Sequence, residues 1–121
     1  MPTIEDGSIN RLARFLDLNV LRGELVMSNM ANVDTPGYRT RDIDFRQELE
    51  RASHAMEFAD FSPVVRTVQG LIERPDGNNV SLERESLLLS DTQLRFNAGV
   101  QLLHDRFKML SAAINEGSSA S

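Results

Sequence analysis

The sequence predicts a mainly α-helical protein in which two long terminal helices form a coiled-coil-like antiparallel pair, joined by a small irregular or β-hairpin middle segment. Three observations support this fold class. Apolar residues near both ends of the chain recur at alternating steps of three and four, the spacing of one stripe on a helix. A Pro-Gly turn follows the first stripe, and a stretch of weaker periodicity rich in turn residues separates it from the second.

Length and composition restrict the possible functions. At 121 residues the chain, 1–121, is predicted to be a single domain, and with one Tyr, six Phe and no Trp its core must be mainly aliphatic. The formal charge of −5 disfavours a nucleic-acid partner, because phosphates are neutralised by clustered Lys and Arg. Without Cys the chain has no disulfides or thiolate metal ligands, so subunit contacts would have to stabilise any extracellular assembly of it.

We expect no membrane span and no cleaved signal peptide. A helix that crosses a bilayer needs about 20 consecutive apolar residues, and no such run occurs. The opening MPTIEDGSINR has neither the basic start nor the apolar stretch of a signal peptide.

The first long helix is predicted at 9–32, within an N-terminal segment 1–32. Ser8 is the candidate N-cap, because a serine hydroxyl accepts a hydrogen bond from an unpaired amide of the first turn. The stripe on this helix consists of Ile9, Ala13, Leu16, Val20, Gly23, Met27 and Met30.

A sharp turn is predicted to end this helix. Pro36 disfavours helical geometry at Thr35, and Pro-Gly fits the centre of a type II turn, where Gly37 takes a positive φ. Asn29 and Asn32 can bond nearby backbone groups that the end of the helix leaves unpaired. The charged run that follows, RTRDID, is expected to be a solvated or inter-subunit face.

The middle segment is predicted to span 33–80. A short helix at 45–58 is predicted from apolar positions at helical steps, Phe45, Leu49, Ala52 and Met56. A small hairpin is expected between 63–68 and 71–73, and a further turn at 75–78. Because an isolated two-stranded hairpin is marginally stable in water, this segment is expected to be mobile.

The second long helix is predicted at 82–115, within a segment 81–116 that a flexible tail, 117–121, follows. Ser81 is placed to cap its start, and Gly117 to supply the left-handed residue after its end. The stripe on this helix is interrupted by Ser86 and Gln93 and otherwise consists of Leu82, Leu89, Phe96, Val100, Leu103, Phe107, Leu110 and Ile114.

Both stripes are long for a small protein to bury. At about 1.5 Å per residue the two helices are roughly 35 and 50 Å long. We therefore interpret the stripes as an assembly seam between subunits. The alternative, which periodicity does not separate, is a two- or three-helix domain that buries both stripes in its own core.

No catalytic, cofactor-binding or metal-binding residue is predicted. His54 and His104 lie on different predicted helices, and neither has a second ligand at the spacing of a zinc-binding helix. No phosphate-binding glycine loop or nucleophile elbow occurs in the sequence. We expect a protein that is not an enzyme; a soluble helical adaptor or chaperone-like module is the leading alternative, and a hydrolase a distant one.

The string SNMANVDTPGYRTRDIDF resembles the signature of the flagellar rod and hook protein family, in which a helix runs into an ANxxTPGY turn. The residues that match this turn motif are Asn29, Ala31, Asn32, Thr35, Pro36, Gly37 and Tyr38. Two later stretches, DGNNVSLERE and QLRFNAGVQLLHDRFKMLSAAI, are similar to the same family in the same order.

This resemblance implies a structural subunit of the proximal rod in the bacterial flagellar basal body, exported by the flagellar type III system and serving torque transmission in motility. The implied partners are other rod subunits, basal-body ring or adaptor proteins and the export apparatus, and the implied location is the periplasmic rod. The stripes at both ends add a mechanism, because helices whose apolar faces lack cover are expected to fold only when neighbours supply it.

Overall fold

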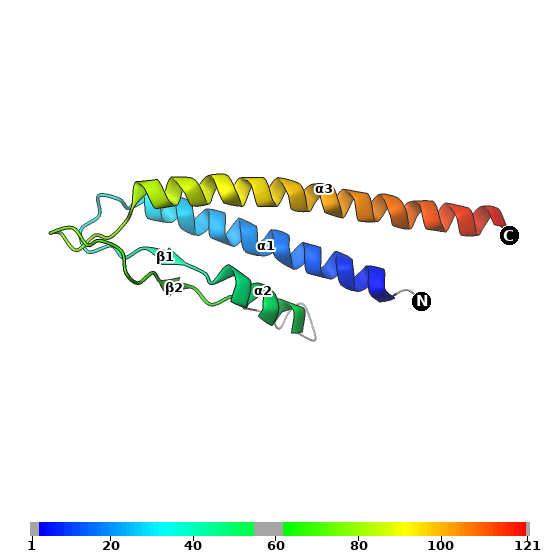
Figure 1. The fold of residues 1–121 in the computed structure, drawn as a ribbon, viewed down its shortest axis with the longest axis horizontal. Helices are drawn as coiled ribbons and strands as arrows, with labels where there is room; N and C mark the ends of the chain where they lie inside the picture. Colours follow the sequence, from blue (N-terminus) through cyan, green and yellow to red (C-terminus); the bar gives the residue numbers. More distant parts are fainter. Residues whose placement is uncertain (1–2, 55–61, 121) are drawn as a thin grey trace.

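The structure, a computed structural model, describes residues 3–54 and 62–120. Its elements are α1 (Thr3–Ala31), β1 (Arg41–Asp42), α2 (Phe45–His54), β2 (Arg66–Thr67) and α3 (Leu82–Ala120). The two long helices lie side by side in opposite directions, and the β-strands and α2 lie along the other side of α1 (Figure 1). The predicted fold class is therefore confirmed.

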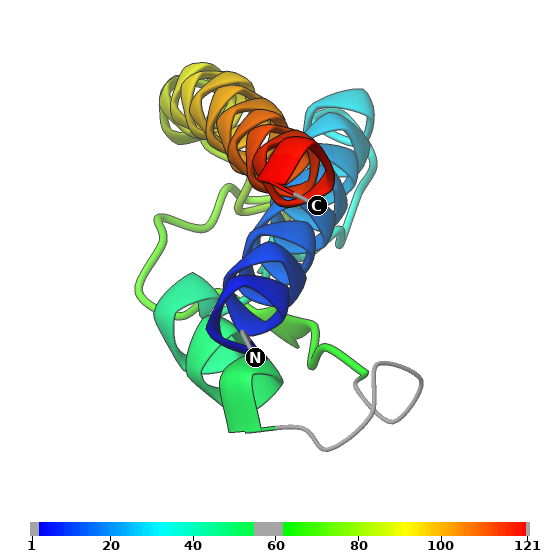
Figure 2. The ribbon, with the colours of Figure 1, turned by 90° about the vertical axis from the view of Figure 1, so that its right-hand side faces the viewer.

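The helix α1 lies between two partners. Seen end-on, α3 lies on one side of α1 and α2 on the other (Figure 2). The core toward the middle segment is built from Leu18 and Leu25 of α1 and from Ile43, with partly buried apolar residues around them, Leu21, Phe45 and Leu49. Because two faces of α1 are covered, its single apolar stripe cannot account for all of its buried positions.

Small residues bring α1 and α3 close together. An added Cβ at Gly99 would lie 2.8 Å from Leu16 Cδ2 and 3.2 Å from Phe15 Cδ1, so the backbone of α3 leaves room for these side chains. On α1, Gly23 faces Thr92, with 3.8 Å between the Cβ position and Thr92 Cγ2. Pairing in this register leaves the last turns of α3 extending past the start of α1 (Figure 1).

The predicted caps had mixed outcomes. Ser81 caps α3 as expected, because the amide of Arg84 donates to Ser81 Oγ at 3.2 Å. The cap at Ser8 is wrong, since α1 already begins at Thr3 and Ser8 lies inside it. The stop at Gly117 is also wrong: α3 continues to Ala120, and Gly117 is helical. An interior glycine costs a helix only about 1 kcal/mol, which is too little to end one by itself.

Two glycine turns meet at the end of the molecule where α1 ends and α3 begins. Gly37 has a φ of 77°, and the amide of Tyr38 donates to Thr35 O at 3.2 Å, as the predicted type II turn requires. The predicted turn at 75–78 is also present, with a φ of 86° at Gly77. The turns touch through a 2.8 Å hydrogen bond from Gly37 N to Asp76 O. A side chain at Gly77 would meet the backbone of Gly37 at 3.3 Å.

The small sheet differs from the predicted hairpin. β2 pairs antiparallel with β1, with Arg41 opposite Thr67 and Asp42 opposite Arg66, so pairing of 63–68 with 71–73 is wrong. The turn after α1 brings β1 back along the helix, and β2 pairs with this strand. The predicted helix at 45–58 is present as α2; its last expected apolar position, Met56, lies outside the described residues.

Candidate functional site

The apolar stripe of α1 is divided between contact with α3 and solvent. Its half-buried members are Ile9, Ala13, Leu16, Gly23 and Met30. Its exposed members are Val20 and Met27. The most deeply buried apolar side chains of α1, Leu18, Leu25 and Val26, lie outside the stripe.

The stripe of α3 is divided in the same way. Its half-buried members are Leu89, Phe96, Leu103 and Leu110. Its exposed members are Leu82, Val100, Phe107 and Ile114. Positions deeply buried on this helix, Glu85, Thr92 and Gly99, again lie beside the stripe.

Each stripe therefore lies partly inside the α1–α3 contact and partly at its border. Residues three and four apart share a helix face, so the exposed members follow the same edge of the pair as the half-buried ones. We call the exposed members the seam edge, namely Val20, Met27, Leu82, Val100, Phe107 and Ile114. Their side chains are between 44% and 63% exposed. The seam is thus neither a closed core nor a wholly uncovered surface.

The residues of the turn motif occupy both exposed and buried positions. Ala31 ends α1, and Thr35, Pro36 and Gly37 form the exposed type II turn. Asn32 behaves as predicted, because its Nδ2 donates to Ser28 O at 2.8 Å across the end of the helix. Asn29, in contrast, is completely buried.

Asn29 joins the first helix to β1 and α3. Its Nδ2 donates to Arg41 O and to Glu85 Oε1, both at 2.8 Å. Its Oδ1 accepts from Arg41 N at 3.1 Å and from the Tyr38 hydroxyl at 2.9 Å. These four bonds satisfy every hydrogen-bonding position of the amide, so its burial carries no unmet polar group.

A set of charged side chains continues this network. Arg84 donates to Glu85 Oε2 at 2.6 Å and to Asp42 Oδ2 at 2.7 Å. Arg22 of α1 binds both oxygens of Asp42, at 3.1 Å and 3.0 Å. We call these residues the polar clamp, namely Arg22, Asn29, Asp42, Arg84 and Glu85. The clamp ties α1, β1 and α3 together at the turn end.

The acidic neighbours of Arg84 in the clamp favour its charged form. Burial lowers the pKa of Arg84, but its hydrogen bonds to Asp42 and Glu85, with their negative charges, outweigh burial and raise the pKa above its ordinary value. Because the pKa of Arg84 is raised in the folded state, the contribution of its charge to stability is fully present at any pH below the unfolded-state pKa. It would be lost only as the pH rises through the folded-state value, far above neutrality.

The Asp76–Asn79 stretch closes the turn from the other side. Asn78 is buried, and its Nδ2 donates to the carbonyls of Asn32 and Thr35, each at 2.9 Å. Asn79 Oδ1 accepts from Thr40 N at 2.7 Å. The two consecutive asparagines thus tie this stretch to the backbone that follows α1.

Neither histidine lies in a candidate catalytic or metal site. His54 and His104 are exposed, on α2 and α3 respectively. Within residues 3–54 and 62–120, no group of three or more His, Cys, Asp or Glu side chains could hold a metal ion. Over the same residues, no helix combines the length and apolar character that crossing a membrane requires.

Comparison with known proteins gives a consistent set of relatives. No protein-family model matches the chain. The chain is 36% identical over 115 residues to the flagellar basal body rod protein FlgB of Cereibacter sphaeroides, covering 84% of this chain and 89% of the relative. It is 29% identical to FlgB of Salmonella typhimurium and 26% identical to FlgB of Escherichia coli, each over 93% of this chain and 96% of the relative.

Proposed function

Because the chain belongs to the FlgB family of flagellar basal body rod proteins, we propose that it packs against neighbouring subunits of the proximal rod along its seam edge. The family makes it a structural subunit of the basal-body rod. The observation that supports the seam edge is the row of half-exposed apolar side chains along the α1–α3 pair.

The seam edge offers enough apolar surface for a stable contact. Full burial of a Val, Met or Phe side chain is favourable by about 1.5–3 kcal/mol. Burying the half of each side chain that is still exposed would therefore be favourable by about 1 kcal/mol. A neighbour that covered the whole edge would therefore gain several kcal/mol before the cost of ordering side chains. In a rod this gain would recur at every subunit.

The polar clamp gives this edge a fixed shape. Its bonds hold α1 and α3 in register at the turn end, where both helices have one terminus. A clamped, antiparallel pair resists sliding of one helix past the other. We propose that this stiffness serves torque transmission, with the chain exported by the flagellar type III system and located in the periplasmic rod.

Cross-linking from the seam edge tests the proposed contact. A photoreactive residue at Val20 or at Val100, both exposed in the isolated chain, is expected to join it to neighbouring rod subunits in flagellated cells. The same residue at Gln101, exposed but off the edge, is the matched control. Equal products from all three positions, or products to cytoplasmic proteins alone, would favour the adaptor or chaperone-like alternative.

Folding on assembly is proposed for the far end of α3. Its last turns extend past α1, and their apolar residue Ile114 is largely exposed. Without a tertiary partner, a terminal helix segment gains little to offset the entropy of ordering.

We expect amide hydrogen exchange to separate the two halves of α3. In the dilute monomer the amides of 85–103 should be protected, and those of 107–120 should exchange at least about tenfold faster. Protection of the second range should rise on assembly. Uniform protection along α3 in the monomer would contradict folding on assembly while leaving the seam contact intact.

A further inference from the structure

We propose that the chain binds a long-chain fatty carboxylate in an apolar pocket between α1, α2 and α3. The acyl chain lies in the pocket, and the carboxylate pairs with Arg11 at the edge of the pocket. The pocket includes none of the seam-edge residues, so ligand binding and subunit contact can each fail while the other stands.

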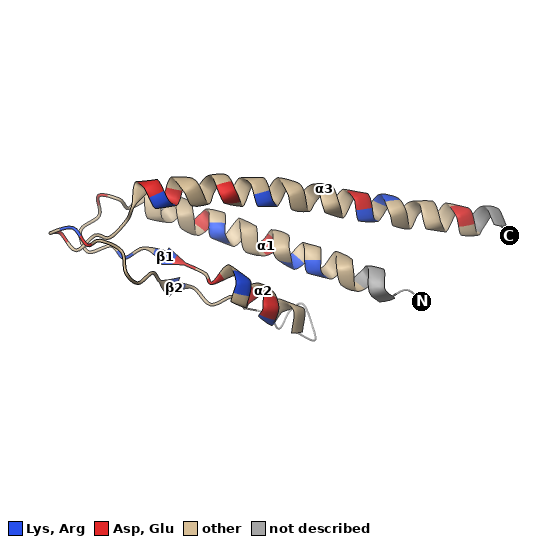
Figure 3. Ribbon diagram, viewed as in Figure 1, with Lys and Arg blue, Asp and Glu red and all other residues tan. Residues whose placement is uncertain are grey.

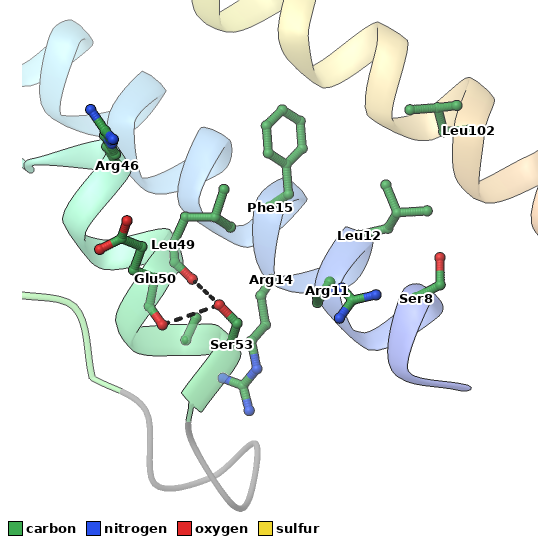
Figure 4. Close-up of a pocket in the computed structure, with 11 residues that line it drawn as sticks. Ser8, Arg11, Leu12, Arg14, Phe15, Arg46, Leu49, Glu50, Ser53 and Leu102 are labelled. Carbon is green, nitrogen blue, oxygen red and sulfur yellow. Dashed lines mark hydrogen bonds between the residues drawn. The ribbon is translucent and has the colours of Figure 1, made fainter. Parts of the chain in front are cut away.

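The pocket has the size and lining of a small-molecule site (Figure 4). Its volume is about 600 Å³, within the range of about 300–1,000 Å³ that is usual for ligand pockets. The apolar residues that line it come from all three helices, namely Leu12, Phe15, Leu49, Ala52 and Leu102. Leu102 is 52% exposed, so a ligand can reach this lining from solvent. The lining residues on α1, from Ser8 to Phe15, extend over about two turns or roughly 10 Å, which suits a chain-like ligand.

The free positive charge of the pocket lies on α1. Both charged lining residues of this helix are arginines, Arg11 and Arg14, whereas α2 contributes one charge of each sign, Arg46 and Glu50 (Figures 3 and 4). Arg46 and Glu50 lie one turn apart on their helix and offset each other. Arg14 is only 7% exposed and already takes part in an interaction. Arg11 is exposed, and among the described residues no hydrogen bond or ion pair involves its guanidinium.

The surroundings of Arg11 fit a carboxylate head with an acyl tail. Arg11 stands near Ser8 and Leu12 at the edge of the pocket (Figure 4). A guanidinium can donate two parallel hydrogen bonds to one carboxylate, and the hydroxyl of Ser8, three residues earlier on the same face, can donate another. From this head the acyl chain continues over Leu12 toward Phe15 and Leu102. A ligand with a cationic head would bring two like charges together here.

Binding is expected to stabilise the fold. The pocket exists only when α1, α2 and α3 are packed together, so the ligand binds the folded chain and not the unfolded one. The melting temperature should therefore rise with ligand concentration. Because the ligand contacts α2 as well as the long helices, it adds a contact between the middle segment and the helix pair.

Calorimetric titration of the full chain with sodium dodecanoate, kept below its micelle concentration, tests the site. We expect one saturable site per chain. Dodecyltrimethylammonium, which has a chain of the same length and a cationic head, should bind at least about tenfold more weakly. The formal charge of the chain is −5, so its overall field favours the cation, and a preference for the anion must come from the pocket.

Two pairs of variants locate the site. Arg11→Gln should weaken dodecanoate binding about tenfold, and Arg41→Gln, exposed on β1 outside the pocket, should leave it unchanged. Leu102→Ser should weaken it at least about threefold, and Leu94→Ser, 70% exposed on the same helix outside the pocket, is its control. Circular dichroism checks that each variant keeps its fold.

Three results would each overturn the proposal. They are titrations without a saturable site, equal affinity for the anionic and cationic probes, and equal losses in a pocket variant and its control. Seam-edge cross-links that persist in that case leave the rod function standing.

Discussion

A Phe107→Asp variant is expected to fold normally and to leave cells without rods and without motility. Phe107 is 51% exposed on the seam edge, so its replacement costs the isolated chain little. In the rod, the same position would bury a carboxylate without a partner, at a cost of several kcal/mol per subunit. Swimming assays and electron microscopy of basal bodies measure the loss, and circular dichroism of the purified chain measures the fold.

Ala98→Asp is the matched control, because Ala98 is exposed on the same helix and lies off the seam edge. It adds the same charge and is expected to keep motility. Leu103→Asp would be less decisive, since Leu103 is half-buried against α1 and its loss would disturb the monomer as well. Normal basal bodies built from the Phe107→Asp chain would rule out the seam edge as a subunit contact.

The two long helices were predictable because their signal is local. Apolar residues three and four apart share a face whatever the rest of the chain does, so the periodicity marks the position of both helices. The division of the stripes was not predictable. Val20 and Leu16 look alike in sequence, yet Leu16 packs against Gly99 of α3 and is half-buried, whereas Val20 is exposed.

Glycines show where local rules are sufficient and where they fail. Gly37 follows a proline that fixes the turn, and its positive φ was predicted correctly. Gly117 was predicted to end α3 in the same way, but α3 passes through it. The two predicted N-caps differ in the same way: Ser81 directly precedes α3, whereas Ser8 lies inside α1.

The polar clamp could not be inferred from spacing. The hydrogen bond from Asn29 to Glu85 joins residues 56 apart in sequence, and no periodic rule relates them. The charged run after the turn was interpreted as a solvated or inter-subunit face, which is wrong for Asp42, because it is buried between Arg22 and Arg84. The resemblance to rod proteins marked these stretches without saying what they contact.

An Asn29→Ala chain is expected to lose about 3–5 kcal/mol of unfolding free energy, the largest effect of any single substitution in the clamp. The change deletes four hydrogen bonds and leaves the buried Glu85 carboxylate with an unmet oxygen. A small domain has only about 5–15 kcal/mol in total. Urea unfolding followed by circular dichroism measures the loss, and Asn97→Ala, an exposed asparagine on α3, should cost less than about 1 kcal/mol.

The isosteric Asn29→Asp variant distinguishes the bond to Glu85 from simple packing. It places a carboxylate where Asn29 Nδ2 stands 2.8 Å from Glu85 Oε1, so two negative charges meet in a buried site. Such a pair raises a carboxyl pKa in the folded state above its unfolded value of about 4, and the folded chain then binds more protons. The stability of the variant should therefore fall as the pH rises from about 4 to 7 and recover on acidification, because protonation turns one oxygen into a donor. A variant as stable as the parent at neutral pH would mean that Asn29 does not hold α3 through this bond.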